Sequence, residues 1–344
     1  MNEPPATSRR VVVTRRGGPE FLEVIEEARP EPRAGEVRIR VEAAGVSGYD
    51  ITSRSHRFPG SPKAPFTLGE DVVGIVDAMG EDVSGIEPGQ RVAAWTFGDG
   101  GGYAEYTCRP ADLVVLVPAG LAPDEAVCLV VNDLTAHLYL YKTARVKQGE
   151  RLLVQGAAGG VGTAILQLGA LAGLELFGTA SPYNHELVTS LGATPIDYRR
   201  EDVVARVREL TGEGVDVVLD LIAGARQLWR SYRCLRKGGR LVMMGSVEAS
   251  ERGLLSIVPS LLFVGGAKLW PDGRSVPMGP NMTDYPFEHH DWYRDTLSEL
   301  LELGATGGLE PVIAERIPLT EARRAHELLE RGGYAGKVVL TTGS

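Results

Sequence analysis

Short apolar runs separated by proline and glycine clusters fill the N-terminal third of the chain. The stretch Val37-Arg38-Ile39-Arg40-Val41 alternates apolar and basic residues, which is typical of a strand with one buried face. Many short strands with frequent turn residues predict a β-rich barrel or sandwich over residues 1–127. The apolar runs expected to form its strands span residues 11–13, 37–43, 72–76, 92–95 and 113–117.

The hydrophobic pattern changes near residue 123, where two helical stretches lead into alternating strands and helices. Leu152–Val154 is a continuous apolar run, as expected for a strand buried on both faces. Strand–helix alternation at this spacing predicts βαβ units around a parallel sheet. The expected helices span residues 123–130, 134–144, 161–172, 185–191, 203–210 and 228–235, and the expected strands 152–154, 174–177, 215–219 and 240–244.

The last hundred residues begin with an apolar run at 262–270, which we interpret as the edge strand of a six-stranded sheet. An exposed apolar edge is a pairing hazard, so we predict a homodimer that buries Phe263 and Leu269 across a two-fold axis. Residues 271–290 show no period and predict a long loop, which caps this edge in the monomeric alternative. The chain then returns to an expected helix, strand, helix and strand at 291–303, 312–317, 319–330 and 337–340.

Composition and charge narrow the possible functions. A chain of 344 residues predicts two or three domains. Its net charge of −9 argues against a nucleic-acid partner. Cys108, Cys128 and Cys234 form no C-x-x-C pair, so neither a disulfide framework nor a cysteine-rich zinc site is expected. The N-terminal residues contain no apolar signal region, and the most apolar stretch, 254–269, is too short to span a membrane, so we expect a cytoplasmic protein.

The strongest chemical signal is the glycine-rich segment Gln155-Gly156-Ala157-Ala158-Gly159-Gly160-Val161-Gly162. It directly follows the strand expected at 152–154 and opens the helix expected at 161–172. In this strand–turn–helix setting the segment fits the dinucleotide fingerprint, with Ala157 in the first glycine position. We predict that Ala158, Gly159, Gly160, Val161 and Gly162 bind the cofactor pyrophosphate through N–H groups at the helix N-terminus.

The next expected strand decides between NAD and NADP. An NAD site places Asp or Glu at its end, whereas this strand ends in Phe177-Gly178-Thr179-Ala180-Ser181. Ser181 avoids the repulsion that a carboxylate would exert on a 2′-phosphate, and Tyr198 and Arg199 follow the neighbouring strand. We therefore predict that NADPH binds in preference to NADH. The alternative for Arg199 and Arg200 is a pair of solvated surface charges.

These features resemble the medium-chain dehydrogenase/reductase superfamily, within its zinc-independent quinone oxidoreductase and enoyl reductase branch. The resemblance implies a GroES-like catalytic domain from residues 1–127 and 267–344, with a Rossmann NADP-binding domain at 128–266. The fold class it implies is α/β, with a doubly wound parallel sheet in one domain and a β-rich GroES-like domain beside it in the chain. The segments that carry it, in family order, are Ala44–Asp50, Leu68–Gly74, Gly89–Val92, Gly102–Tyr106, Leu134–Ala136, Gly156–Gly162, Ser190–Ala193 and Leu235–Leu241.

Departures from the family pattern bear on the chemistry. Zinc-dependent members have Cys where this chain has Ser47 and His where it has Leu68, so we predict that no metal is bound. Without a Lewis acid at the carbonyl, a conjugated acceptor such as a quinone or an α,β-unsaturated carbonyl is favoured. Many quinone oxidoreductases carry Asn near the position of Ser47 and Tyr near that of Thr52; both are changed here.

The resemblance also implies the roles of individual residues. Asp50, Thr52 and Asn132 are expected to line the nicotinamide end of the site as catalytic residues, with Ser47 nearby. The residues expected to contact the cofactor elsewhere are Thr135 at the phosphates, Ser181 and Tyr198 at the 2′-phosphate, and Gly245, Ser246 and Lys337 near the nicotinamide ribose.

Two other functions remain open. The unusual 271–290 segment and the missing Tyr motivate a biosynthetic tailoring enzyme on the same scaffold that performs no net reduction. A structural or single-strand nucleic-acid-binding relative is a further alternative, against which the acidic charge and the 6% aromatic content argue. The principal hypothesis is an NADPH-dependent, zinc-independent oxidoreductase that acts on a small molecule.

Overall fold

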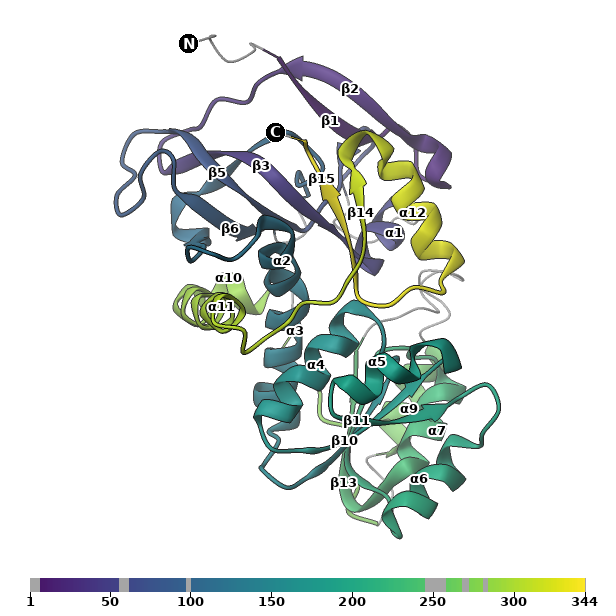
Figure 1. Cartoon of the computed structure of the whole chain (residues 1–344). Helices are drawn as coiled ribbons and strands as arrows, with labels where there is room; N and C mark the ends of the chain where they lie inside the picture. Colours follow the sequence, from purple (N-terminus) through teal and green to yellow (C-terminus); the bar gives the residue numbers. More distant parts are fainter. Residues whose placement is uncertain are drawn as a thin grey trace. The chain divides into compact units, whose positions relative to one another are not determined.

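The computed structural model describes residues 7–55, 62–96, 100–244, 258–267, 272–280 and 284–343. The chain divides into two compact units, the first formed by Met1–Leu134 and Thr283–Ser344 and the second by Thr135–Met282. Both ends of the chain thus contribute to one unit (Figure 1). The domain boundaries predicted after residues 127 and 266 stay a prediction.

The first unit is built from two sheets of mainly antiparallel strands. A three-stranded sheet has the order β2-β1-β4, and a seven-stranded sheet has the order β14-β15-β3-β5-β6-β8, with β7 also paired to β3. The strands are β1 (Thr7–Val13), β2 (Leu22–Ala28), β3 (Glu36–Val46), β4 (Phe66–Thr67), β5 (Asp71–Met79), β6 (Arg91–Trp95), β7 (Tyr106–Pro110), β8 (Val114–Leu116), β14 (Ile313–Pro318) and β15 (Lys337–Thr341).

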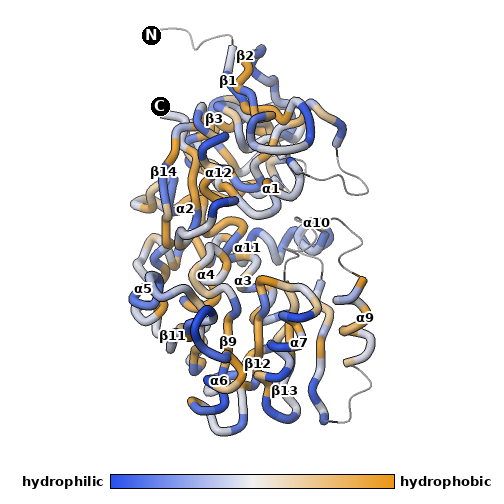
Figure 2. The backbone as a smooth tube through the Cα atoms, turned by 90° about the vertical axis from the view of Figure 1, so that its right-hand side faces the viewer, coloured by the Kyte–Doolittle hydropathy of each residue, from blue (hydrophilic) through white to orange (hydrophobic). Residues whose placement is uncertain are grey.

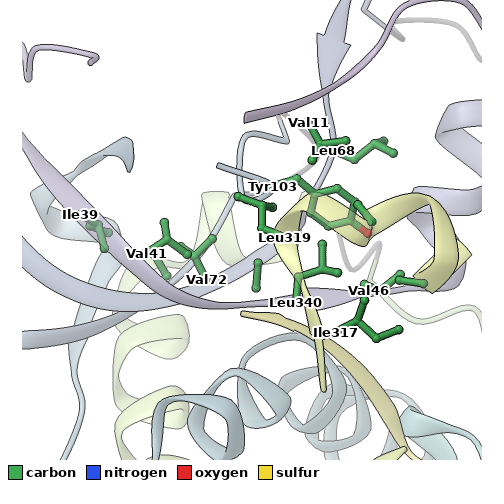
Figure 3. Close-up of a cluster of buried hydrophobic side chains, with 14 of the residues drawn as sticks. Val11, Ile39, Val41, Val46, Leu68, Val72, Tyr103, Ile317, Leu319 and Leu340 are labelled. Carbon is green, nitrogen blue, oxygen red and sulfur yellow. The ribbon is translucent and has the colours of Figure 1, made fainter. Parts of the chain in front are cut away.

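Helices connect and cover these sheets. The α-helices are α1 (Gly48–Ser55), α2 (Pro123–Cys128), α10 (Tyr285–Glu288), α11 (His290–Ala305) and α12 (Ala322–Arg331), joined by the 3-10 turns η1 (Pro19–Phe21), η2 (Ala111–Leu113) and η7 (Leu319–Glu321) and the π-helical η3 (Leu129–Asp133). Alternation along β3 buries Val37, Ile39 and Val41 in the core. Figure 3 shows this core, in which Tyr103 lies among the aliphatic side chains beside Leu319.

The second unit is a five-stranded parallel sheet with the order β11-β10-β9-β12-β13. The first strand lies in the middle and the order reverses beside it, which is the doubly wound Rossmann arrangement. Its strands are β9 (Arg151–Gln155), β10 (Glu175–Ala180), β11 (Ala193–Asp197), β12 (Val215–Asp220) and β13 (Leu235–Met243). Its α-helices are α3 (Leu134–His137), α4 (Gly160–Leu171), α5 (His185–Ser190), α6 (Val203–Thr211), α7 (Ala225–Cys234) and α9 (Val258–Ala267). The π-helical η4 (Leu138–Ala144) follows α3, and the 3-10 turn η5 (Pro182–Asn184) precedes α5.

The edge strand predicted at 262–270 is wrong. Residues up to Ala267 belong to the helix α9, and Leu269 lies outside the described residues. Phe263 packs in edge-to-face contact with Tyr232 and Trp229 of α7, with ring centroids 5.8 and 6.3 Å apart. A continuous apolar run fits a buried helix as well as a strand, and Figure 2 shows α9 as hydrophobic. The edge-strand reason for a homodimer is therefore lost.

The segment predicted as a loop at 271–290 is irregular only in part. The described residues 272–280 form no helix, and Ser275 makes an isolated bridge with Arg240. The short α10 and the first residue of α11 follow before residue 291. None of the helices in the described ranges is long and apolar enough to cross a membrane.

Candidate functional site

The glycine-rich turn between β9 and α4 has its conformation fixed by the neighbouring strand. Gly156 adopts a φ of +83°, where a side chain would be strained. Its N–H donates to Thr179 Oγ1 at 3.1 Å, and the N–H of Ala157 donates to the carbonyl oxygen of Thr179 at the same distance. Because β9 lies where the strand order reverses, the turn is at the position that binds ligands in open α/β sheets.

Two glycines in the turn serve different purposes. A Cβ on Gly162 would lie 2.3 Å from the carbonyl oxygen of Gly156, so the first turn of α4 approaches the loop more closely than any side chain allows. A Cβ on Gly159 would meet only that same oxygen, at 3.6 Å, which is ordinary contact. Gly162 is thus needed for folding of the turn, whereas Gly159 keeps the surface of the turn bare.

The N-terminus of α4 presents N–H groups that suit an anion. Gly159 caps the helix with extended backbone and no side-chain hydrogen bond. Within the described part of the chain, no acceptor is found for the N–H groups of Gly160, Val161 and Gly162, whereas the N–H of Thr163 donates to Gly159. Unsatisfied donors at a helix N-terminus attract phosphate oxygens. The N–H groups of Gly160, Val161 and Gly162, within the predicted stretch 158–162, therefore suit a pyrophosphate.

The ends of β10 and β11 bring Ser181 and Tyr198 together, as the sequence predicted. Ser181 Oγ lies 3.3 Å from the Tyr198 hydroxyl, and Arg199 Nε donates to that hydroxyl at 3.4 Å. The hydrogen bond from Ser181 and the adjacent guanidinium hold the pKa of Tyr198 below its usual value. The guanidinium of Arg199 also lies over the Tyr183 ring, 5.9 Å from its centroid. This cluster offers hydroxyl donors and one positive charge, a set that suits a phosphate.

An acid does stand near this cluster, at the end of β11 rather than β10. Asp197 pairs in register with Ala180 and is buried. Its Oδ1 accepts the backbone N–H of Arg199 at 2.9 Å, and its Oδ2 lies 3.7 Å from Arg200 Nε. The carboxylate is thus occupied by its own turn. Glu175, the acid within β10, is bound to Arg151 at the opposite end of that strand.

In the first unit, Ser47 and Asp50 form a tight corner at the start of α1. Asp50 Oδ2 accepts both the backbone N–H and the hydroxyl of Ser47, each at 2.8 Å, and Oδ1 accepts the N–H of Gly69 at 2.9 Å. Asp50 is completely buried. Burial raises the pKa of Asp50 to about 6, although the hydrogen bonds from Gly69 and Ser47 oppose this rise.

The other predicted catalytic residues occupy two different elements. Thr52 lies on α1 and its hydroxyl donates to the Gly48 carbonyl oxygen at 3.0 Å. Asn132 is buried in η3, next to Asp133. Burial raises the pKa of Asp133 to about 8, although the nearby Lys337 opposes the shift. The structure thus joins Ser47 directly to Asp50, while Thr52 bonds within its own helix.

Lys337, predicted near the nicotinamide ribose, is bound within the core of the first unit. Its Nζ lies 2.5 Å from Asp71 Oδ2, and both side chains are almost completely buried. Burial lowers the pKa of Lys337, but the attraction of Asp71 outweighs it, so the pKa is raised overall. A Cβ on Gly45 would collide with both side chains, at 2.2 Å from Lys337 and 2.3 Å from Asp71. The sequence did not indicate Asp71 as a partner.

The predicted residues fall into two groups by unit. Thr135, on α3, is buried and belongs to the second unit with the turn, Ser181 and Tyr198. Gly245 and Ser246 lie outside the described residues. The residues that sequence reasoning missed are Tyr103, His326 and Arg54, which are all fully buried in the first unit. Tyr103 stands in a segment that matches the family, but nothing in the sequence indicated His326.

Among the described residues, no three histidine, cysteine, aspartate or glutamate side chains gather as a metal site. Ser47 and Leu68 occupy the positions where zinc-dependent members of the superfamily have ligands, and neither side chain suits zinc. Ser47 is engaged with Asp50, and Leu68 belongs to the apolar core. The chemistry of these two positions therefore does not fit a catalytic zinc.

Comparison with known proteins identifies the family. An alcohol dehydrogenase GroES-like domain model matches residues 33–119, and a model described as zinc-binding dehydrogenase matches residues 191–340. Quinone oxidoreductase from Lama guanicoe is 33% identical over 340 residues, covering 96% of this chain and 97% of that protein.

Solved structures agree with this relationship. A mycobacterial protein complexed with NADPH has a TM-score of 0.83 at 29% identity, covering 97% of this chain and 99% of its own. The CurK enoyl reductase has a TM-score of 0.84 at 26% identity, covering 98% and 99%. With the Rossmann turn, the GroES-like unit and the missing zinc ligands, these likenesses show that the chain belongs to the medium-chain dehydrogenase/reductase superfamily, in its zinc-independent quinone oxidoreductase and enoyl reductase branch, a family of oxidoreductases.

Proposed function

We propose that this protein is an NADPH-dependent oxidoreductase that transfers hydride to a quinone or an α,β-unsaturated carbonyl. The observation that carries the proposal is the end of β10, where Ser181, Tyr198 and Arg199 meet and where the nearby Asp197 carboxylate accepts a backbone N–H of its own turn. The mycobacterial relative complexed with NADPH supports the choice of cofactor.

The residues of the second unit fit NADPH by their donors. The N–H groups at the start of α4 suit the pyrophosphate, and the bare Cα of Gly159 allows close approach. The hydroxyls of Ser181 and Tyr198 and the guanidinium of Arg199 suit the 2′-phosphate. Thr135, Gly245 and Ser246 remain assigned to the same cofactor. When bound, the reduced nicotinamide supplies the hydride.

Ser47 and Leu68, which stand where zinc-dependent relatives have metal ligands, favour a conjugated acceptor. Zinc-dependent relatives stabilise charge on a carbonyl oxygen with a metal, which these two side chains cannot hold. In a quinone or enone, negative charge spreads over the conjugated system, so less local stabilisation is required. The quinone oxidoreductase and enoyl reductase relatives support this substrate class.

In the first unit, we assign Ser47, Asp50, Thr52 and Asn132 to the substrate-handling side of the reaction. Asp50, which is fully buried, holds the Ser47 hydroxyl in one orientation. Lys337 is assigned a positioning role, because its ammonium is already bound to Asp71.

A turnover assay tests the proposal. Purified protein is mixed with NADPH and a panel of quinones and enones, while the absorbance of the reduced nicotinamide and the mass of each product are followed. We expect NADPH oxidation with at least one member, with product gaining two hydrogens. Absence of oxidation across the panel, with NADPH bound, would overturn the proposal in favour of a tailoring enzyme without net reduction.

The oligomeric state of the protein is a separate proposal. A homodimer stays a prediction, now without the edge strand that motivated it. Light scattering at micromolar concentration tests it: we expect about twice the single-chain mass of 36.9 kDa, and a mass near that of one chain would contradict it.

A further inference from the structure

Asp50 belongs to a row of buried polar side chains in the first unit that begins and ends on α1. The row continues through Tyr103, which precedes β7, to His326 on α12 and Arg54 on α1. All four side chains are completely buried. Figure 3 shows Tyr103 among aliphatic side chains of the same core, and its hydroxyl lies beside His326.

The contacts in the row are continuous. Burial and the neighbouring Asp50 carboxylate, acting through its charge and a side-chain hydrogen bond, raise the pKa of Tyr103, and the Tyr103 hydroxyl lies 3.2 Å from His326 Nε2. On the other side of the imidazole, His326 Nδ1 lies 3.3 Å from Arg54 Nη1. The partners come from far apart in the chain: His326 follows Tyr103 by 223 positions and Arg54 by 272.

The chemistry of these groups gives the row a single direction. A guanidinium has N–H donors and no acceptor, so Arg54 must donate and His326 Nδ1 must accept. A neutral imidazole that accepts at Nδ1 carries its proton on Nε2, which therefore donates to the Tyr103 oxygen. The Tyr103 O–H then has Asp50 as its acceptor. Every hydrogen bond in the row points toward the Asp50 carboxylate.

Arg54 sets the direction of these hydrogen bonds, because other contacts hold its guanidinium in place. Its Nε donates to the Gly17 carbonyl oxygen at 3.1 Å, and its Nη2 is paired with Glu330 on α12. Burial and the charge of Arg54 lower the pKa of His326 to about 3, so the imidazole stays neutral at physiological pH. The acceptor at Nδ1 is therefore maintained.

The consequence falls on Ser47. Asp50 Oδ2 accepts the Ser47 hydroxyl, so that hydrogen points inward, and the N–H of Asp50 donates back to Ser47 Oγ at 3.3 Å. A hydroxyl has one hydrogen and two lone pairs. The hydrogen and one lone pair are used within the corner, which leaves Ser47 with one free lone pair.

We propose that Tyr103 and His326 are positioning residues that hold Asp50 as an acceptor and so make Ser47 a hydrogen-bond acceptor toward the bound ligand, for a hydroxyl or amide N–H group. Ser47 is then not the proton donor of the reduction, and the proton that accompanies the hydride must come from another group or from solvent. The inference rests on the proposed function for the identity of the reaction, but not for the direction of the hydrogen bonds.

The charged and hydrogen-bonding groups around Asp50 determine the pH at which the Ser47 hydroxyl loses its orientation. Ser47, Gly69 and Tyr103 donate to it, while Asp71 on β5 repels it and Lys337 on β15 attracts it. Protonation of Asp50 turns the carboxylate into a donor and frees the Ser47 hydroxyl to rotate. With the pKa of Asp50 raised to about 6 by burial, the Ser47 orientation is present above that pH and is lost below it.

The first test reads the tautomer of His326 without any turnover. The full-length protein is labelled with ¹⁵N-histidine, and the His326 signals are assigned by their loss in His326→Gln. We expect a proton on Nε2, none on Nδ1, and no titration between pH about 5 and about 8. A proton on Nδ1, or a titration in this range, would overturn the inference even if the enzyme were inactive.

The second test compares two tyrosine variants. Tyr103→Phe removes one donor to Asp50, so we expect the acidic limb of the kcat/KM profile to move up by about one pH unit, with NADPH affinity unchanged. Tyr293→Phe is the control, because that buried hydroxyl bonds Trp95 and Leu113 outside the row.

The two tests separate the inference from the proposed function. Equal shifts in both variants, or no shift in Tyr103→Phe, would contradict the positioning role. If Tyr103→Phe does not fold, the histidine tautomer of the unmodified protein decides alone. If the enzyme oxidises NADPH with no acceptor, the proposed function fails while the tautomer still reports on the row.

Discussion

The glycine turn of the second unit and the Ser47–Asp50 corner of the first are built on opposite principles. The turn offers backbone N–H groups for binding, and it depends on positions without side chains, Gly159 and Gly162. The corner depends on buried side chains whose charge and hydrogen positions are set by partners up to 272 residues away. The proposed ligand contacts thus come mainly from the backbone in the second unit and from side chains in the first.

The difference predicts how each region responds to mutation. In the turn, one added methyl group blocks a ligand or a backbone contact, so effects are steric and local. In the corner, the loss of a hydroxyl leaves a buried polar group with fewer partners, so effects are electrostatic and depend on pH. The predictions below separate these two kinds of response.

The largest effect is expected from the paired substitutions Gly162→Ala and Gly159→Ala. Gly162→Ala places Cβ 2.3 Å from a carbonyl oxygen, so we expect a large fall in Tm and loss of NADPH binding by at least about 100-fold. Gly159→Ala meets nothing closer than 3.6 Å, so its Tm should be unchanged while NADPH affinity still falls. Calorimetry measures both quantities. Equal behaviour of the two variants would contradict their different roles.

The second effect concerns cofactor choice. Ser181→Asp places a carboxylate beside Tyr198, where it would repel a 2′-phosphate and accept ribose hydroxyls. We expect NADPH affinity to fall by about 100-fold and NADH affinity to rise, which inverts the preference. Thr189→Asp, on the exposed surface of α5, adds the same charge as a control and should leave the preference unchanged. An unchanged preference in Ser181→Asp would refute the assignment of the 2′-phosphate site.

The third effect is a pH-dependent stability change at Asp133. Its pKa is raised by burial to about 8 in the folded protein from 3.8, so stability is lost as pH rises from about 4 through about 8. Asp133→Asn removes this ionisation, so its Tm relative to the parent should rise across that range by several degrees. The exposed Asp82→Asn should show no such trend. A Tm difference independent of pH would show that Asp133 ionises normally.

The smallest effect is expected from metal removal. Because Ser47 and Leu68 cannot complete a zinc site, prolonged dialysis against EDTA should leave NADPH oxidation within about twofold. Metal analysis of the purified protein should find well below one zinc per chain. One tightly held zinc per chain, with activity lost on chelation, would contradict the metal-free chemistry.

The two regions also differ in how far they were predictable from sequence. The place of the turn between a strand and a helix was predicted, because its fingerprint lies within eight consecutive positions. Most strands and helices followed from periodicity, including the alternating strand at Val37–Val41. The row from Asp50 to Arg54 was not predicted, since its members meet only through tertiary folding.

One error has an identifiable physical cause. The apolar run at 262–270 has no polar alternation, so its period could not separate a helix from a strand, and its first six residues belong to the helix α9. The place of Lys337 at the cofactor stays a prediction, and the structure adds a contact that the sequence did not indicate, since its charge is bound to Asp71. A buried lysine requires a partner, and that partner lies 266 residues away in sequence.

The central claim is that the second unit selects NADPH by the phosphate-binding cluster at the ends of β10 and β11. Calorimetric titration of the purified protein with NADPH and with NADH, at equal ionic strength, tests it most directly. We expect NADPH to bind at least about tenfold more tightly, since a 2′-phosphate gains charge-assisted hydrogen bonds from Ser181, Tyr198 and Arg199. Tighter binding of NADH, or no binding of either nucleotide, would contradict the claim.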